Sequence, residues 1–197
     1  TRLQIVALII IKVPYPGEYA EINSFNINDV NEGEKIDLSF LIDSLGNESI
    51  HAFPSFEIYS KNELVEKYSF PDEIIENRSS KSFTKTLEKN YSAGYYNASV
   101  YLTYGTLESK TISSKKDFRV GNLFVDIINY TDYFNKSKLN DFYIVVESRW
   151  NDNIENIYAE INVSYLNKSY ADNFKTPPIR LKKWEHGILK GFFNTEN

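Results

Sequence analysis

The first thirteen residues carry the longest unbroken hydrophobic pattern in the chain. Read as a strand, residues 3–13 have one wholly apolar face and a second face that is apolar in its middle. β-Branched side chains dominate, which favours a pleated strand over a helix. A strand that is apolar on both faces requires burial on both faces. The apolar members are Leu3, Ile5, Val6, Ala7, Leu8, Ile9, Ile10, Ile11 and Val13.

This segment has three other interpretations. A signal peptide would be followed by small residues at a cleavage site, whereas Pro14-Tyr15-Pro16-Gly17 follows here. A transmembrane helix needs about 20 apolar residues, and Lys12 and Pro14 end the run before that length. An ordinary core strand of its own chain remains the main alternative.

Downstream, short alternating runs are separated by turn signals such as Asn31-Glu32-Gly33 and Ser92-Ala93-Gly94, which is typical of an all-β sandwich. Gly and Pro are sparse, and no segment has a long helical period. Seven strands up to Val120 would complete an immunoglobulin-like domain. They are expected at residues 20–27, 36–43, 53–60, 64–70, 82–87, 95–104 and 110–120.

After Gly121 the pattern starts again and predicts strands at 123–130, 141–149, 157–166, 170–174 and 187–193. Residues 35–40 correspond to residues 139–144 at an offset of 104, and residues 83–87 correspond to 189–193 at an offset of 106. Carried forward, this repeat places the last strands of a second sandwich beyond Asn197. We therefore expect an all-β chain of two immunoglobulin-like β-sandwich domains, with the second domain incomplete.

Composition excludes several classes of function. The chain of 197 residues has a formal net charge of −5 and no basic stripe, so we expect no nucleic-acid partner. It has no cysteine, which removes disulfides, thiolate metal sites and thiol catalysis. The 21 Asn and 28 Ser plus Thr predict about three Asn-x-Ser/Thr sequons by chance, but the chain has eight. One explanation of this excess is the Asn-rich composition alone. The other is that the chain is a secreted protein that is glycosylated at these sequons. The sequons begin at Asn47, Asn77, Asn90, Asn97, Asn129, Asn135, Asn162 and Asn167.

No pattern for catalysis or for a cofactor is present. His51 and His186 have no partners at metal-ligand spacing, and no phosphate-binding or nucleophile motif occurs. Acidic residues cluster at Asp72, Glu73 and Glu76, for which solvated loops are the default interpretation. A calcium site is a further candidate, at Asp126, Asp132, Asp141 and Asp152. Trp150 and Trp184 could form a carbohydrate-binding face; the alternative is that both lie in the core. We expect no enzyme, no metal and no cofactor.

An N-terminal strand without a place in a complete first domain and a second domain that lacks a strand complement each other. One explanation is donor-strand complementation, in which residues 3–13 of one copy fill the second domain of the next. Because donor and acceptor lie in different domains, such contacts do not close and form a filament. The alternatives are a further strand of the first domain, and a fragment of a longer tandem array.

The apolar N-terminal strand, the Pro14-Tyr15-Pro16-Gly17 segment, the paired immunoglobulin-like domains and the crowded sequons resemble the thread filament subunits of archaeal cell surfaces. The resemblance covers the whole chain, rests on architecture and composition, and includes no diagnostic motif. It implies a donor strand and hinge at 1–17, a first domain at 18–121 and an acceptor domain at 122–197. It further implies an extracellular, N-glycosylated homopolymer without a membrane span. The alternative function is an adhesive or carbohydrate-binding module of a tandem surface protein.

Overall fold

The computed structural model of the chain describes residues 13–106, 108–135, 138–162, 164–165, 168–169 and 174–194, and the side chains of 164–165, 168–169 and 174 are outside that description. All regular structure within these residues is β-strand, as the sequence predicted. The described part of the chain therefore has no helix that could cross a membrane.

The chain divides into two compact units, each with its own sheets. Unit 1 comprises the residues up to Asn28 together with Lys35–Lys89 and Tyr95–Phe118. Unit 2 comprises Asp29–Glu34, Asn90–Gly94 and Arg119–Asn197. Two short segments of the expected first domain thus belong to unit 2. Asn31 and its neighbours bond to residues around Gly121 and Asn151, and the Ala93 N–H donates to the Glu32 carboxylate at 2.6 Å.

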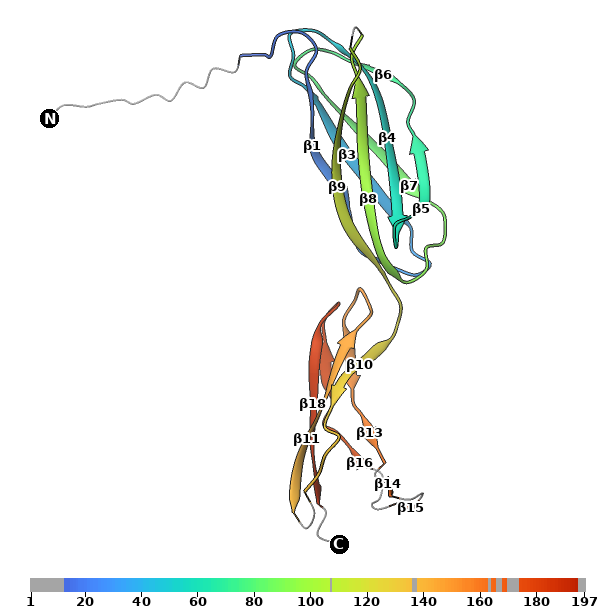
Figure 1. Cartoon of the computed structure of the whole chain (residues 1–197), viewed down its shortest axis with the longest axis vertical. Coiled ribbons are helices and arrows are strands. Elements are labelled where there is room, and N and C mark those ends of the chain that lie inside the picture. The colour runs from blue at the N-terminus through green and yellow to red at the C-terminus, as the bar shows by residue number, and fades with distance from the viewer. Residues whose placement is uncertain are drawn as a thin grey trace, which may run out of the picture. The chain divides into compact units, whose positions relative to one another are not determined.

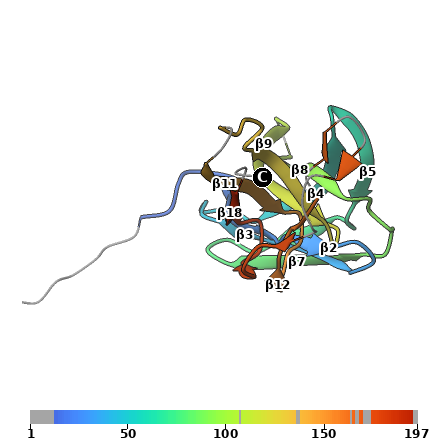
Figure 2. The same cartoon turned by 90° about the horizontal axis from the view of Figure 1, so that it is seen from below.

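Two sheets form unit 1, and their strands lie in separate layers in Figures 1 and 2. One sheet has the order β1-β3-β7, and the other contains β9-β8-β4-β5 with β6 on β4. A short strand, β2, extends the second sheet by parallel pairing with the end of β9. The arrangement resembles an immunoglobulin-like sandwich. The strands of these two sheets are β1 (Ala20–Ile27), β3 (Ile36–Ser44), β4 (Ile50–Ser60), β5 (Glu63–Ser69), β6 (Glu73–Ile75), β7 (Ser80–Leu87), β8 (Gly94–Tyr104) and β9 (Lys110–Gly121), together with β2 (Val30–Asn31), whose residues belong to unit 2.

Alternating side chains explain the packing of unit 1. Along β3, every second residue from Ile36 to Ser44 is buried, which is the period of a strand with one face on the core. Phe70, which follows β5, contacts Phe40 of one sheet at 5.4 Å and Phe56 of the other at 6.1 Å between ring centroids. Aromatic contacts of this kind join the two inner faces into one core.

Unit 2 has smaller sheets. The largest has the order β10-β11-β18, and three two-stranded pairs are β12-β17, β13-β16 and β14-β15. The strand expected at 157–166 is broken, with Asn156 at a positive φ of 57° before it. The strands are β10 (Val125–Tyr130), β11 (Leu139–Ser148), β12 (Ile154–Ile157), β13 (Glu160–Ile161), β14 (Ser164–Tyr165), β15 (Lys168–Ser169), β16 (Phe174–Lys175), β17 (Ile179–Leu181) and β18 (His186–Asn194).

Candidate functional site

The sheet β10-β11-β18 of unit 2 repeats the sheet β1-β3-β7 of unit 1 in strand order and in register. Residues that pair in unit 1 have counterparts 104–106 positions later that pair in the same way, in agreement with the offsets found in the sequence. Each first strand also has a register irregularity at the equivalent place, after Ile22 and after Ile127. Matched pairs are Ile22–Ile42 with Ile127–Val146, and Phe40–Phe83 with Ile144–Leu189.

The repeat extends to part of the second sheet. The pairing of β4 with β6 corresponds to that of β12 with β17, and the pairing of β4 with β5 corresponds to that of β13 with β16. Unit 2 thus has counterparts of β1, β3, β4, β5, β6 and β7. Matched pairs are Ile50–Ile75 with Ile154–Leu181, and Phe56–Tyr68 with Ile161–Phe174.

The counterparts of β8 and β9 are not among the described strands of unit 2. In unit 1, the other edge of β4 pairs with β8 along its length, from Ala52–Tyr104 to Tyr59–Asn97. Within the described residues, β12 pairs only with β17 and β13 only with β16. The edge of β12 and β13 that corresponds to the β8 side of β4 therefore carries backbone groups without a strand partner, which is a template for strand addition.

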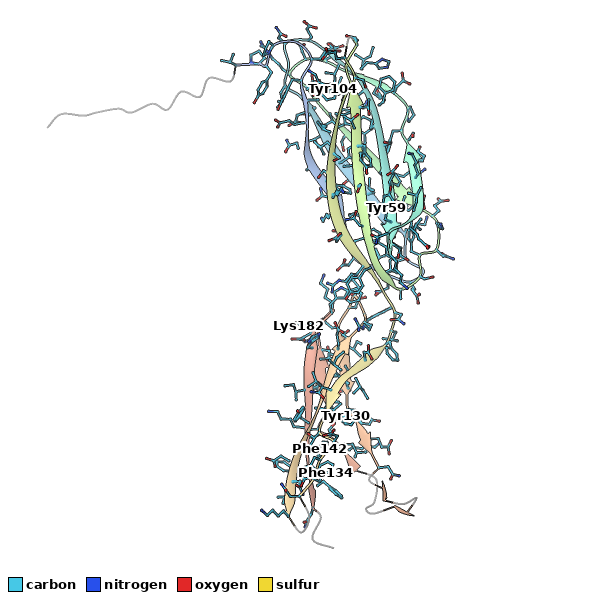
Figure 3. The ribbon with its side chains drawn as sticks, in the orientation of Figure 1. Tyr59, Tyr104, Tyr130, Phe134, Phe142 and Lys182 are labelled. Carbon is cyan, nitrogen blue, oxygen red and sulfur yellow. The ribbon has the colours of Figure 1, made fainter. Side chains whose placement is uncertain are left out.

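The inner face of the β10-β11-β18 sheet is exposed beside this edge. Ile127 and Tyr130 pair with Val146 and Ile144, so they face the same side as the core. They are nevertheless 61% and 60% exposed, and Figure 3 labels Tyr130 on this sheet. Their counterparts in unit 1, Ile22 and Phe25, are partly buried.

The core of unit 2 is correspondingly small. Val146, Leu181 and Leu189 are buried together, and the hydrophobic residues packed around them are only partly buried. Together, the unpaired edge and the exposed inward-facing side chains form a surface to which an added apolar strand could pair and pack. We call the edge of β12 and β13 with Ile127 and Tyr130 the acceptor site. The sequence predicts an acceptor in the second domain but did not single out Ile127 and Tyr130; the repeat offset, applied to Ile22 and Phe25, could have found them.

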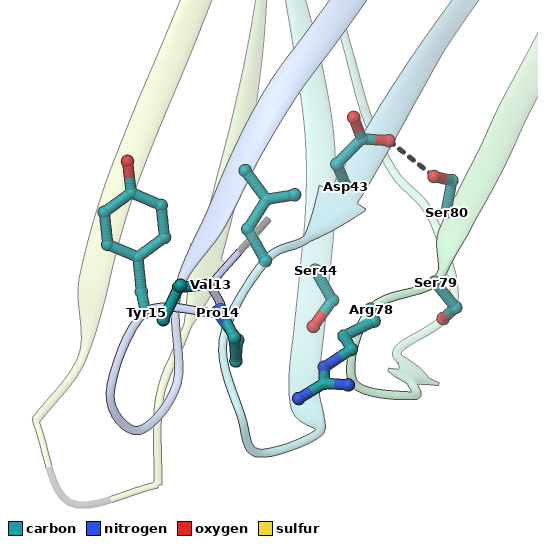
Figure 4. A pocket seen from close by; sticks show the side chains of 9 residues that line it. Val13, Pro14, Tyr15, Asp43, Ser44, Arg78, Ser79 and Ser80 are labelled. Atoms are coloured by element: carbon teal, nitrogen blue, oxygen red, sulfur yellow. Dashed lines mark hydrogen bonds between the residues drawn. The ribbon is translucent and has the colours of Figure 1, made fainter. Parts of the chain in front are cut away.

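The residues expected to act as the donor strand, Leu3, Ile5, Val6, Ala7, Leu8, Ile9, Ile10 and Ile11, lie outside the described residues. Val13 is described and is 80% exposed. Val13, Pro14 and Tyr15 line one side of a pocket in unit 1 whose other side includes Ser44 and Arg78 (Figure 4).

Residues Tyr15–Gly17 are attached to unit 1 by the loop after β3. Tyr15 donates its N–H to the Leu45 carbonyl and accepts from the N–H of Asn47, and the Gly17 N–H donates to the Asn47 side-chain oxygen at 2.6 Å. At Gly46 a Cβ would clash with the Gly17 carbonyl. Tyr15 and Gly17 of the expected hinge at Pro14–Gly17 are thus hydrogen-bonded to unit 1.

The structure exposes most of the sequon asparagines that it describes. Asn97 is partly buried on β8, where its amide donates to the Asp117 carboxylate at 2.7 Å. It points away from the buried neighbours Tyr96 and Ala98, as alternation predicts. Asn167 lies outside the described residues. The exposed sequon asparagines are Asn47, Asn77, Asn90, Asn129, Asn135 and Asn162.

The other candidate chemistry does not assemble into a site. The described residues contain no group of three or more His, Asp or Glu that could hold a metal, which covers Asp126, Asp132, Asp141 and Asp152. The acidic cluster is divided among separate partners. These are His51 for Asp72 at 2.8 Å, Lys81 for Glu73 at 3.4 Å and Ser49 for Glu76 at 2.8 Å, while His186 lies 3.2 Å from Glu147.

Both tryptophans belong to unit 2 and are partly buried. The Trp184 ring is covered by the Arg119 guanidinium at 4.3 Å, and its N–H donates to Asn151 at 3.1 Å. This face of the ring is therefore occupied and is not a free platform for a sugar. The sequence left open whether the tryptophans form a carbohydrate-binding face or belong to the core. With partial burial, each tryptophan is neither fully in the core nor fully exposed.

Among the described residues, the shifted pKa values belong to unit 1, where a hydrogen bond to Glu21 raises the pKa of Tyr19 to about 12. Hydrogen bonds from Lys67 and Tyr59 lower the pKa of Glu57, and Lys67 has a raised pKa in return. A hydrogen bond with His51 lowers the pKa of Asp72. The Glu57 and Lys67 atoms are 2.8 Å apart on neighbouring strands, so this pair stabilises the pairing of β4 and β5.

No family model matches the chain, and no curated protein matches it. Among solved structures, red sea bream transglutaminase is 9% identical with a TM-score of 0.41, over 88% of this chain and 29% of that protein. Escherichia coli alpha-2-macroglobulin activated by porcine elastase is 8% identical with a TM-score of 0.37, over 88% and 18% respectively. The similarity to the β-domains of these proteins is distant, and the chain spans less than a third of either.

Proposed function

We propose that this protein is a structural subunit of an extracellular filament, in which the N-terminal strand of one copy fills the acceptor site of the next. The observation that carries the proposal is the acceptor site: a domain repeat with an unpaired edge and inward-facing side chains left 61% and 60% exposed. The donor is residues 3–13, whose two apolar faces suit a position inside a sandwich.

The chemistry of donor and acceptor is complementary. A strand added to the β12 and β13 edge would pair its backbone there and lay one face over Ile127 and Tyr130. Burying the six apolar side chains on the odd-numbered face of residues 3–13 contributes about 1.5–3 kcal/mol each, and less for Ala7. The ladder bonds add about 0.5–1.5 kcal/mol each, whereas association costs about 4–15 kcal/mol. The balance favours a joint that dissociates very slowly.

The remaining features fit this role. The exposed sequons suit a surface carrying N-linked glycans, and the resemblance to archaeal thread subunits implies the same location and assembly. We assign no enzymatic reaction, cofactor or nucleic-acid partner to the chain. The proposed partners are neighbouring copies of the same protein, joined head to tail.

The test compares the full chain with a variant lacking residues 1–13, using electron microscopy. The full chain is expected to form long filaments, and the deletion variant is expected to remain monomeric. A synthetic peptide of residues 1–13 should bind the deletion variant and slow amide hydrogen exchange in β12 and β13 of unit 2. The matched control is the same peptide with Ile9→Asp, which places a charge in the apolar face and should not bind.

Filaments formed without residues 1–13, or protection by the peptide of β1 and β9 in unit 1 instead of β12 and β13, would contradict the proposal. A deletion variant that stays monomeric and binds a carbohydrate as strongly as the full chain would favour the binding-module alternative. In that case the peptide would have no effect on unit 2.

A further inference from the structure

The outer face of the β11-β18 pair is apolar where the equivalent face of unit 1 is polar. On this face, away from the core, Leu139, Tyr143, Ile188 and Phe192 are 65%, 43%, 51% and 67% exposed. In the register of the repeat, unit 1 has Lys35, Ser39, Ser82 and Thr86 at these positions. The two sheets thus have the same register but differ in the hydrophobicity of the outer face, and an exposed apolar face marks an interaction site.

Asp141 on this face has no hydroxyl donor at the position where its unit 1 counterpart, Asp37, has one. In unit 1, the Thr86 hydroxyl donates to the Asp37 carboxylate across the strand pair at 2.6 Å. In unit 2, the equivalent pair is Asp141 and Phe192, and Phe192 has no donor to offer. Lys190 lies on the same face opposite Tyr143, one pair along from Asp141, so an acidic and a basic side chain lie within the apolar row. Glu147 and His186, 3.2 Å apart, pair with each other further along this face.

We propose that this face, defined by Leu139, Tyr143, Ile188 and Phe192 with Asp141 and Lys190, binds the same face of a second copy. A two-fold contact places identical patches against each other, so Asp141 of each copy can meet Lys190 of the other. Asp141 and Lys190, which lie within the apolar row, make this part of the face self-complementary in charge. A surface of this kind is separate from the acceptor site, which lies on the inner face of the sheet.

Four apolar side chains form a small contact, which by itself gives weak association. Repetition changes this, because a polymer presents the same face at every subunit and many weak contacts act together. If the proposed filaments form, the face joins them side by side into bundles. Single subunits should form dimers only at high protein concentration.

A sequon borders this face. Asn129 of β10 pairs with Val145 on the outer side of the sheet, and its side chain is exposed. A glycan on Asn129 would cover the β10 side of the face and oppose the contact. Chain produced without glycans should therefore associate more strongly than glycosylated chain.

The experiment replaces the four apolar residues in the full chain by their unit 1 counterparts: Leu139→Lys, Tyr143→Ser, Ile188→Ser and Phe192→Thr. Bundles are measured by low-speed pelleting and electron microscopy, and subunit association by sedimentation velocity. The variant should keep single filaments but lose bundles, with self-association weakened about tenfold or more. The control variant carries Leu64→Ser and Ile74→Ser, at unit 1 positions 54% and 67% exposed, and should behave as the parent chain.

Charge reversal tests the orientation of the contact without touching the apolar row. Lys190→Glu alone should abolish lateral association, and the double variant Asp141→Lys with Lys190→Glu should restore it. Bundling that survives the four-residue exchange, or a double variant that stays dissociated while folded, overturns the proposal. If the full chain forms no filaments, the proposed function fails, whereas concentration-dependent dimers that respond to these substitutions still support this face.

Discussion

Units 1 and 2 share a register but differ in how completely that register is covered. In unit 1, both sheets contribute buried inner side chains, such as Phe40, Phe56 and Val100, and Ile22 and Phe25 of β1 are partly buried. In unit 2, the counterparts of β1, β3 and β7 pair as in unit 1, yet Ile127 and Tyr130 remain exposed. The comparison teaches that antiparallel neighbours determine the register of a sheet, whereas burial of its face depends on strands supplied by the opposite sheet.

The largest difference in stability between the two units is expected at equivalent positions of β4 and β13. Phe56→Ala in unit 1 is expected to cost about 3–5 kcal/mol, because Phe56 is fully buried. Ile161→Ala at the equivalent place in unit 2 should cost less than about 1 kcal/mol, because Ile161 is only partly buried. Urea unfolding of the variant lacking residues 1–13 measures both. Tryptophan fluorescence reports unit 2, which holds both tryptophans, and hydrogen exchange reports unit 1.

Adding the peptide of residues 1–13 should change this result in one unit only. The cost of Ile161→Ala should rise once the acceptor site is filled, while the cost of Phe56→Ala should stay the same. A cost at Ile161 that equals the cost at Phe56 without peptide would show that unit 2 is already closed.

A smaller effect is expected on the inner face of the first sheets. Ile22→Ser should destabilise unit 1 by about 1–3 kcal/mol, because Ile22 packs beside the buried Ile42. Ile127→Ser should change the stability of the unpolymerised subunit by less than about 0.5 kcal/mol. The same substitution should weaken binding of the donor peptide, measured by isothermal titration calorimetry. Equal losses of stability in both variants would contradict the acceptor site.

The sequence predicted most of unit 1 because its strands alternate clearly and carry aromatic and β-branched residues. β1 begins and ends as expected, and β3, β7 and β8 differ by two residues or fewer at each end. The two-residue strand β2 and the three-residue β6 were missed, because so few residues show no period. The Lys61-Asn62 turn was also hidden, since its positive φ angles of 49° and 67° fall on a lysine and an asparagine, not on glycine.

Prediction from sequence was weaker in unit 2 for a physical reason. The segment expected as one strand at 157–166 contributes to three short pairs, so alternation alone did not show where pairing stops. The exposure of Ile127 and Tyr130 depends on strands that the described residues of unit 2 do not contain, which no local pattern reveals. The prediction of an incomplete sandwich came from the internal repeat, which relates residues far apart.

The central strands of the two equivalent sheets, β3 and β11, each end in a buried serine, and the two serines differ in hydrogen bonding. Ser44 and Ser148 are equivalent and fully buried, but the Ser44 hydroxyl has no hydrogen-bond partner in the structure. The Ser148 hydroxyl accepts from the Trp150 N–H at 3.2 Å. Ser148→Ala should therefore cost about 0.5–1.5 kcal/mol, and Ser44→Ala should be neutral or stabilising. Thermal unfolding of the two variants checks this, and a larger loss at Ser44 would contradict it.

The smallest expected difference is a pH dependence that comes from the Glu57–Lys67 pair of unit 1. The pKa of Glu57 is lowered from its ordinary value of 4.5 by hydrogen bonds from Lys67 and Tyr59, whereas the equivalent position in unit 2 is Asn162. A carboxyl with a lowered pKa adds stability above its ordinary pKa and loses it as the pH falls through its folded value. Unit 1 should thus lose less than about 1 kcal/mol as the pH falls below 4.5, because Lys67 is 58% exposed and solvent screens the pair. Glu57→Gln should remove this part of the pH dependence in hydrogen exchange of β4 and β5, and an unchanged pH profile would show that the ion pair contributes nothing to the difference between the units.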